Sequence, residues 1–198
     1  MTSGGRIGVF GGTFDPPHIG HLSVAVEVRH ALSLDRMLLV VANDPWQKRG
    51  SRALTPAADR LEMVRLAVGD LDGVEVDDRE IRRGGASYTV DTVRELLEEA
   101  SGAEVFVVVG GDAAAGITTW ERADELARLA TFVTVHRPGF DGPAPAEGFG
   151  WAEVEVPALD VSSSDLRARI ADGRPIEVLV PGPVATWIAE HRIYPRDR

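Results

Sequence analysis

The sequence predicts an α/β fold: a Rossmann-like, doubly wound parallel sheet with C-terminal helices. Short apolar runs alternate with helical patterns of about 10–15 residues, which is typical of β-α-β units whose strands are covered on both faces. With 198 residues the chain can bury one full core, so we expect a single domain spanning residues 1–198. In such a sheet, ligands bind beyond the carboxyl ends of the strands, where the strand order reverses.

The expected strands are short apolar runs separated by helical or turn segments. They cover residues 7–10, 37–42, 74–76, 105–109, 131–136 and 153–156. Helices are expected from Ile19, Pro56 and Val90, near residues 121–129, and at the C-terminal end over residues 164–172 and 183–191.

Local chemistry marks several element boundaries. Thr55 and Pro56 supply an N-cap and a proline at the first helical position. Asp91 places a negative charge in the first turn of the helix that follows Thr89. Prolines and glycines over residues 138–150 predict a loop.

Composition narrows the class of protein. No apolar run approaches the roughly 20 residues needed to cross a bilayer, and the N-terminus lacks the layout of a signal peptide. The absence of cysteine excludes disulfides and thiolate metal sites. We therefore expect a cytoplasmic protein that does not bind membranes, and the sequence leaves a homo-oligomer open.

The charge balance is strongly acidic. A net charge of −10 argues against nucleic acid as a partner, because binding to nucleic acid needs a basic surface. An anionic ligand would need a locally built site, since the overall field repels it. Of the 21 basic residues only Lys48 is lysine, either by accident or because a compact, flexible charge is needed there.

The most informative segment is Gly11-Gly12-Thr13-Phe14-Asp15-Pro16-Pro17-His18-Ile19-Gly20-His21, which joins the first strand to the first helix. Free N–H groups and the positive end of the helix dipole favour phosphate binding at such a turn. Two histidines three residues apart can point at the same anion. The alternative is a sharp structural connection with capping histidines, and the spacing is not that of a dinucleotide-binding G-x-G-x-x-G motif.

These residues resemble the signature of the HIGH-motif nucleotidyltransferase superfamily, and the whole chain most resembles its bacterial nicotinate-mononucleotide adenylyltransferases. The resemblance implies adenylyl transfer from ATP to nicotinate mononucleotide in NAD biosynthesis. It also implies that the first motif binds ATP through Gly11, Gly12, Thr13, Phe14, His18 and His21.

A second motif, Val161-Ser162-Ser163-Ser164-Asp165-Leu166-Arg167, fits a capping box that opens a helix, with Ser162 as the cap. It could be a plain cap and no more. It resembles the family's I-S-S-T-x-[IL]-R element, which implies that Ser163, Ser164 and Arg167 hold the triphosphate of ATP. Val161 and Ser164 depart mildly from that pattern.

A third motif ends the fourth expected strand with Gly110, Gly111 and Asp112. An aspartate in a turn is commonplace, but an acid at this edge of a sheet can bind ribose hydroxyls. The family has G-A-D here, which implies that Gly110 lets the backbone approach the nucleotide and that Asp112 contacts a ribose.

Other positions resemble the part of the family's site that binds nicotinate mononucleotide. A tryptophan at the start of a helix is more often a core residue, but Trp120 resembles the aromatic residue that stacks on the nicotinate ring. Tyr88 and Thr89 belong to an S-Y-T-x-D-T element whose N–H groups would receive the ring carboxylate. A carboxylate gains from a helix N-terminus, whereas an amide gains less. Thr13, Lys48 and Arg137 complete the implied acceptor set.

The resemblance implies a mechanism without a general base. The mononucleotide phosphate is already ionised, so positioning and charge stabilisation suffice for its attack on the α-phosphorus of ATP. The catalytic candidates are His18, His21, Lys48 and Arg167. Lys48 lies in N-D-P-W-Q-K, where the family often has P-P-H-K, so an expected imidazole is missing. Mg²⁺ would be carried mainly by the ATP phosphates, with few ligands from the protein, and no residue is assigned as a metal ligand.

Two alternatives remain open. Another HIGH-motif transferase, acting on phosphopantetheine or on a sugar or alcohol phosphate, shares the first motif but not the element around Tyr88 or Trp120. The second alternative is a non-catalytic module that senses ATP or NAD. Such a module would not need the catalytic candidates His18, His21, Lys48 and Arg167.

Overall fold

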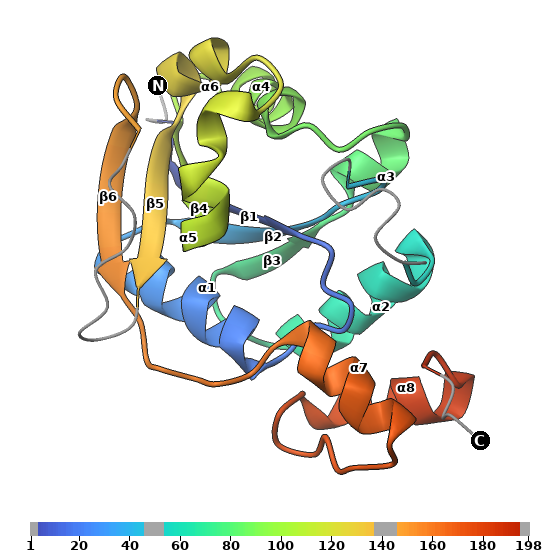
Figure 1. The fold of residues 1–198 in the computed structure, drawn as a ribbon. Helices are drawn as coiled ribbons and strands as arrows, with labels where there is room; N and C mark the ends of the chain where they lie inside the picture. Colours follow the sequence, from blue (N-terminus) through green and yellow to red (C-terminus); the bar gives the residue numbers. More distant parts are fainter. Residues whose placement is uncertain (1–3, 46–53, 137–145, 195–198) are drawn as a thin grey trace.

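The computed structural model describes residues 4–45, 54–136 and 146–194. Within these residues, six parallel strands form one sheet in the order β3-β2-β1-β4-β5-β6 (Figure 1). The strands are β1 (Arg6–Gly12), β2 (Arg36–Val41), β3 (Val74–Asp77), β4 (Glu104–Val109), β5 (Thr131–His136) and β6 (Gly150–Glu155). The order reverses between β1 and β4, which confirms the predicted doubly wound, Rossmann-like fold.

Helices cover both faces of the sheet. They are α1 (Ile19–Ala31), α2 (Ala57–Val68), α3 (Arg79–Arg83), α4 (Thr89–Glu99), α5 (Gly111–Ala115), the 3₁₀ helix η2 (Ile117–Thr119), α6 (Ala123–Leu129), α7 (Ser163–Ala171) and α8 (Gly182–His191). No helix in the described ranges is both long and apolar enough to cross a membrane.

Side chains point alternately to the two faces of the sheet along each strand, which produces one apolar core on each face. Met37, Leu39 and Val41 of β2 face the core shared with α1 and α2. Leu38 and Val40 face the opposite core, which α4 and α6 cover. A third apolar cluster joins α7 and α8 to α2, so the C-terminal helices lie below the sheet in Figure 1, beside α2 and the first turn of α1.

Several predicted boundaries were wrong. Helix α2 begins at Ala57 with Pro56 as its N-cap, so Thr55 is not the cap. The last strand starts at Gly150 rather than Glu153, because it pairs with the full length of β5. Helices α3, α5 and η2 were missed because each has only three to five residues, too few to show a periodic pattern. Of the predicted loop, residues 137–145 lie outside the described part of the chain.

Arg60 of α2 is a buried cation that joins three segments near the ends of β1 and β2. Its side chain is 1% exposed. The guanidinium donates to the carbonyl oxygens of Thr13, Ala42, Asn43 and Thr55 at 2.7–3.2 Å. Because buried carbonyls need partners, this one side chain sets where the turn after β1 lies relative to β2.

We predict that Arg60→Met lowers the free energy of unfolding by about 3 kcal/mol or more, because several buried carbonyls lose their donor. Urea unfolding monitored by circular dichroism measures the loss. The control is Arg65→Met on the same helix, where the half-exposed side chain pairs with Glu62 and Asp78 at 3.7 Å. That variant should stay within about 0.5 kcal/mol of wild type, and equal losses would contradict the role of Arg60.

Candidate active site

A cavity of about 220 Å³ opens at the carboxyl ends of β1 and β4, where the strand order reverses. Gly11 and Gly12 at the end of β1, Thr13 in the turn that follows, and Gly110 after β4 contribute to its wall. Ligands bind at this position in doubly wound sheets, so the fold itself indicates a binding site here.

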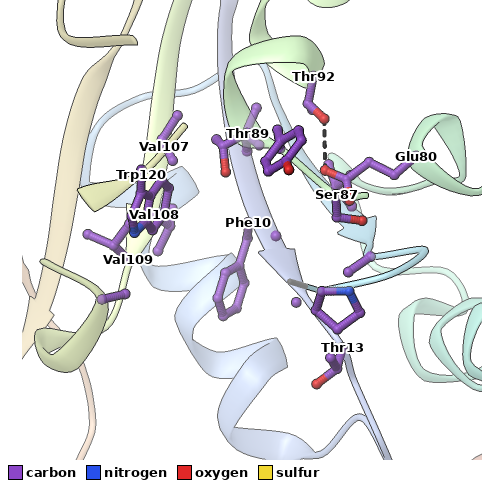
Figure 2. Close-up of a pocket in the computed structure, with 18 of the residues that line it drawn as sticks. Phe10, Thr13, Glu80, Ser87, Thr89, Thr92, Val107, Val108, Val109 and Trp120 are labelled. Carbon is purple, nitrogen blue, oxygen red and sulfur yellow. Dashed lines mark hydrogen bonds between the residues drawn. The ribbon is translucent and has the colours of Figure 1, made fainter. Parts of the chain in front are cut away.

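The two sides of the cavity come from different segments of the chain. Figure 2 shows Trp120 beside Val108 and Val109 on one side, and Thr89 with Ser87 on the other. Trp120 packs edge-on against Phe132, with ring centroids 6.4 Å apart. Its indole Nε1 is buried without a hydrogen-bond partner. Trp120 follows η2 and precedes α6, so the prediction that it starts a helix was wrong.

The described lining of the cavity is acidic rather than basic. It includes Glu80 and Glu121 and no lysine, arginine or histidine. Glu80 is 6% exposed and accepts a hydrogen bond from Thr92 at 2.8 Å, drawn as a dashed line in Figure 2. An anion bound beside Thr89 would therefore rely on the N–H groups at the start of α4. Tyr88, the N-cap of that helix, makes no side-chain cap hydrogen bond.

The two histidines of the first motif stack on each other at the start of α1. Their ring centroids lie 3.7 Å apart. The backbone N–H of His18 donates to Nδ1 of His21 at 3.2 Å, which leaves a neutral His21 with its proton on Nε2. Burial lowers the pKa of His18 to about 4. His18 is therefore uncharged at neutral pH and can act there as a hydrogen-bonding group but not as a cation.

The N-terminal end of α7 lies directly against the first motif. Arg167 donates to the carbonyl of Asp15 at 2.7 Å and to Oγ of Ser164 at 3.0 Å. Ser163 donates to the carbonyl of Pro16 at 2.8 Å. The two motifs, about 150 residues apart in sequence, thus share one surface.

Only one of the two hydrogen bonds of the predicted capping box at α7 is present. Ser162 accepts a hydrogen bond from the backbone N–H of Asp165 at 3.1 Å. The reciprocal half of the box is missing, because the Asp165 carboxylate accepts instead from Arg169 at 2.6 Å.

Tyr194, which sequence reasoning missed, also holds the first motif. Its hydroxyl donates to Oδ1 of Asp15 at 2.6 Å, and Asp15 is fully buried. Burial and the Asp15 carboxylate raise the pKa of Tyr194 well above 10. The contact spans 179 positions, so no local sequence signal could have indicated it.

Comparisons with known proteins show which family the chain belongs to. The family described as cytidylyltransferase-like matches residues 9–169. The chain is 45% identical over 195 residues to a probable nicotinate-nucleotide adenylyltransferase of Corynebacterium kroppenstedtii, covering 96% of this chain and 90% of that one. A protein of the same name from Leifsonia xyli is 43% identical over 192 residues, covering 96% and 94%. The chain belongs to the nicotinate-nucleotide adenylyltransferase family.

Solved structures support the fold of this adenylyltransferase family. The structure of Plasmodium falciparum nicotinic acid mononucleotide adenylyltransferase complexed with NaAD matches with a TM-score of 0.79. The two sequences are 18% identical, and the match covers 98% of each chain. A nicotinate-nucleotide adenylyltransferase structure from Vibrio parahaemolyticus matches with a TM-score of 0.69 at 18% identity, covering 96% of this chain and 95% of that one.

Within this adenylyltransferase-family chain, the predicted site residues fall into two groups. One lines the cavity and consists of Gly11, Gly12, Thr13, Tyr88, Thr89, Gly110 and Trp120. The other lies along the turn, α1 and α7, and consists of His18, His21, Ser163, Ser164 and Arg167.

The other predicted residues are buried in the core or lie at least partly outside the described structure. The Phe14 side chain is 1% exposed and belongs to the core, which leaves only its backbone for a ligand. Asp112 lies in the first turn of α5, and its side chain is outside the described part of the structure. Lys48 and Arg137 lie outside the described residues altogether.

We predict that burial of neutral His18 makes this adenylyltransferase-family protein lose stability in acid. Its folded-state pKa of about 4 lies below the ordinary value of 6.5. Stability from this residue is therefore full above pH 6.5 and is lost, by about 3 kcal/mol, as the pH falls towards 4. Urea unfolding at a series of pH values measures the loss.

The His18→Gln variant tests the cause. Its free energy of unfolding should vary less with pH over this window, because Gln does not titrate. His30→Gln, at an exposed position on α1, should keep the wild-type profile. A pH profile of His18→Gln that matches wild type would contradict the assignment.

Proposed function

We propose that this protein transfers the adenylyl group of ATP to nicotinate mononucleotide, giving nicotinate adenine dinucleotide and pyrophosphate in NAD biosynthesis. The single observation that carries the proposal is the cavity at the strand-order reversal. There a glycine-rich turn, a helix N-terminus without a side-chain cap and a tryptophan converge. Membership of the nicotinate-nucleotide adenylyltransferase family supports the same reaction.

The proposed step is an in-line displacement. An oxygen of the mononucleotide phosphate forms a bond to the α-phosphorus of ATP, the bond to the bridging oxygen breaks, and pyrophosphate leaves with that electron pair. No proton has to be removed from the nucleophile, so the protein acts by positioning and by stabilising charge.

The histidine pair and α7 would contact the triphosphate. His21 would present Nε2–H to the reacting phosphate, because its Nδ1 accepts from the His18 backbone. Burial keeps His18 neutral, so it would donate a hydrogen bond rather than supply a charge. Arg167 would supply positive charge while holding the turn through the Asp15 carbonyl. Ser163, Ser164 and the N–H groups of α7 would complete this side, together with Lys48.

Other contacts to ATP would come from the glycine-rich segments. Gly11, Gly12, Thr13 and Phe14 would offer backbone groups, and Gly110 with Asp112 would approach a ribose.

The acceptor would occupy the cavity between Trp120 and α4. The nicotinate ring would stack on Trp120, and its carboxylate would meet the N–H groups beginning at Thr89. Tyr88 and Thr13 would line its path, and Arg137 would bind the mononucleotide phosphate.

We propose that Mg²⁺ arrives with the ATP phosphates. The groups along the turn are mainly N–H and O–H donors, which suit phosphate oxygens, and the Asp15 carboxylate already accepts from Tyr194 and from the Thr55 N–H. Across residues 4–45, 54–136 and 146–194 no group of three or more acidic or histidine side chains could hold a metal. We also propose that the enzyme works in the cytoplasm, where ATP is made and used.

Pyrophosphate release from ATP across a panel of acceptor phosphates tests the function. The panel comprises nicotinate mononucleotide, nicotinamide mononucleotide, phosphopantetheine, and a sugar and an alcohol phosphate. We expect nicotinate mononucleotide to give the highest kcat/KM. A higher value for phosphopantetheine or for a sugar or alcohol phosphate would identify a different transferase. ATP binding without release with any acceptor would indicate a non-catalytic module.

We expect His21→Ala to lower kcat by about 10³-fold, because a donor to the transition-state phosphate is lost. Circular dichroism should show a retained fold. His30→Ala, at an exposed position on the same helix, is the control and should keep wild-type turnover. Near-normal pyrophosphate release by His21→Ala would remove His21 from the mechanism.

We expect Trp120→Ala to raise KM for nicotinate mononucleotide by about tenfold, because stacking is lost, with little change in KM for ATP. Trp187→Ala on α8 is the control, since Trp187 stacks on His191 away from the described cavity lining. An unchanged acceptor KM would contradict the stacking role.

A further inference from the structure

The first turn of α4 carries a negative charge close to the proposed anion site. Asp91 lies two residues after Thr89, within the first turn. A carboxylate there is attracted by the same N–H groups and helix dipole that would receive the ring carboxylate of the acceptor. Left uncompensated, Asp91 would repel an anionic ligand from this helix end.

In the structure Asp91 is paired with Arg122. The Nη2 of Arg122 donates to Oδ1 of Asp91, and the two side chains are 34% and 28% exposed. Arg122 follows Trp120 by two residues and is the N-cap of α6, with a φ of +52° in the left-handed region. That conformation costs free energy for a non-glycine residue, which makes the residue a candidate for a functional position.

The same guanidinium lies beside a second carboxylate. The Nε of Arg122 is 4.0 Å from Oε1 of Glu121, which lines the cavity. The hydrogen bond to Asp91 raises the pKa of Arg122, and the carboxylates of Glu125 and Glu121 raise it further. Arg122 therefore faces three acids at the acceptor site, while the described lining itself contains acids and no cation. Arg83, another basic side chain close to α4, is engaged by Glu95 at 2.7 Å and by Thr92 at 3.3 Å.

We propose that Arg122 is a specificity-determining residue: by neutralising Asp91 and Glu121, it keeps the N-terminus of α4 attractive to the carboxylate of an acid acceptor. This inference rests on the proposed function and adds to it a residue that sets the preference for acid over amide. The two mononucleotides share the pyridinium and the phosphate and differ only in this group: the carboxylate carries a negative charge, whereas the carboxamide carries none and responds far less to the same potential.

A purely mechanical role gives a different expectation. If the pair only braced α4 against α6, loss of either partner would disturb the cavity equally, and acid and amide acceptors would suffer alike. If charge is what matters, loss of the cation should harm acid binding, whereas loss of the anion should not.

The experiment measures KM for nicotinate mononucleotide, nicotinamide mononucleotide and ATP in four variants. We expect Arg122→Gln to raise KM for the acid by about 3- to 10-fold, with less than about twofold change for the amide or for ATP. Asp91→Asn should leave acid KM unchanged or lower. The Asp91→Asn/Arg122→Gln double variant should recover part of the loss, and Arg122→Lys should keep the acid preference.

Isothermal titration with nicotinate mononucleotide alone supplies a readout independent of turnover, and circular dichroism confirms folding. The matched control is an exposed ion pair at the amino-terminal end of β2, away from the cavity, between Arg36 and Glu75 at 3.4 Å. Arg36→Gln and Glu75→Gln should leave the acid-to-amide ratio at its wild-type value.

Two failures can be told apart. A wild-type protein that neither binds nor adenylates either mononucleotide overturns the proposed function, and this inference with it. An active wild type overturns the inference alone if Arg122→Gln weakens acid and amide equally, or if Asp91→Asn is as harmful as Arg122→Gln.

Discussion

The site depends on the hydrogen bonds that the buried guanidinium of Arg60 donates to backbone carbonyls. This guanidinium donates to carbonyl oxygens in the turn after β1, in the two residues after β2 and in Thr55, which lies two residues before α2. A buried cation is tolerated only when its donors are satisfied, so these segments must converge on it. Since a trans peptide directs its C=O and N–H oppositely, the Thr13 carbonyl that faces Arg60 turns the Phe14 N–H away from it.

The same constraint extends to the acceptor side. Asn43, whose carbonyl accepts from Arg60, uses its backbone N–H to reach Oγ of Ser87 at 2.9 Å and its side-chain amide to reach the Gly85 carbonyl at 2.8 Å. Ser87 returns a backbone hydrogen bond to Asp44 at 3.0 Å. These hydrogen bonds attach the loop before α4 to the end of β2. The position of this side of the cavity wall is therefore fixed by the packing of the core.

Although the whole chain is acidic, the charge of each group around the site is set by its immediate neighbours. His18 is held neutral by burial, Arg167 is aimed at the turn by Asp15 and Ser164, and Arg122 covers Asp91. None of these groups needs to gain or lose a proton when the phosphate of the acceptor attacks the α-phosphorus of ATP. Such an arrangement is suited to catalysis by preorganised donors, in which the protein does not reorganise as charge moves.

What the sequence determined by itself was local in the chain. Four features depend on residues only a few positions apart, whose conformation is set by their neighbours in the chain. They are the alternation of strands and helices, the glycine-rich turn, the Ser162 cap and the position of Asp91. Short elements and the place of Trp120 escaped prediction because three to five residues carry no period. The contacts of Arg60, Tyr194 with Asp15, and Arg122 with Asp91 were decided only by the tertiary structure. Apart from the contact of Arg60 with Thr55, five positions away, they join groups 17 to 179 positions apart, and only packing of the sheet and helices brings such groups within hydrogen-bonding distance.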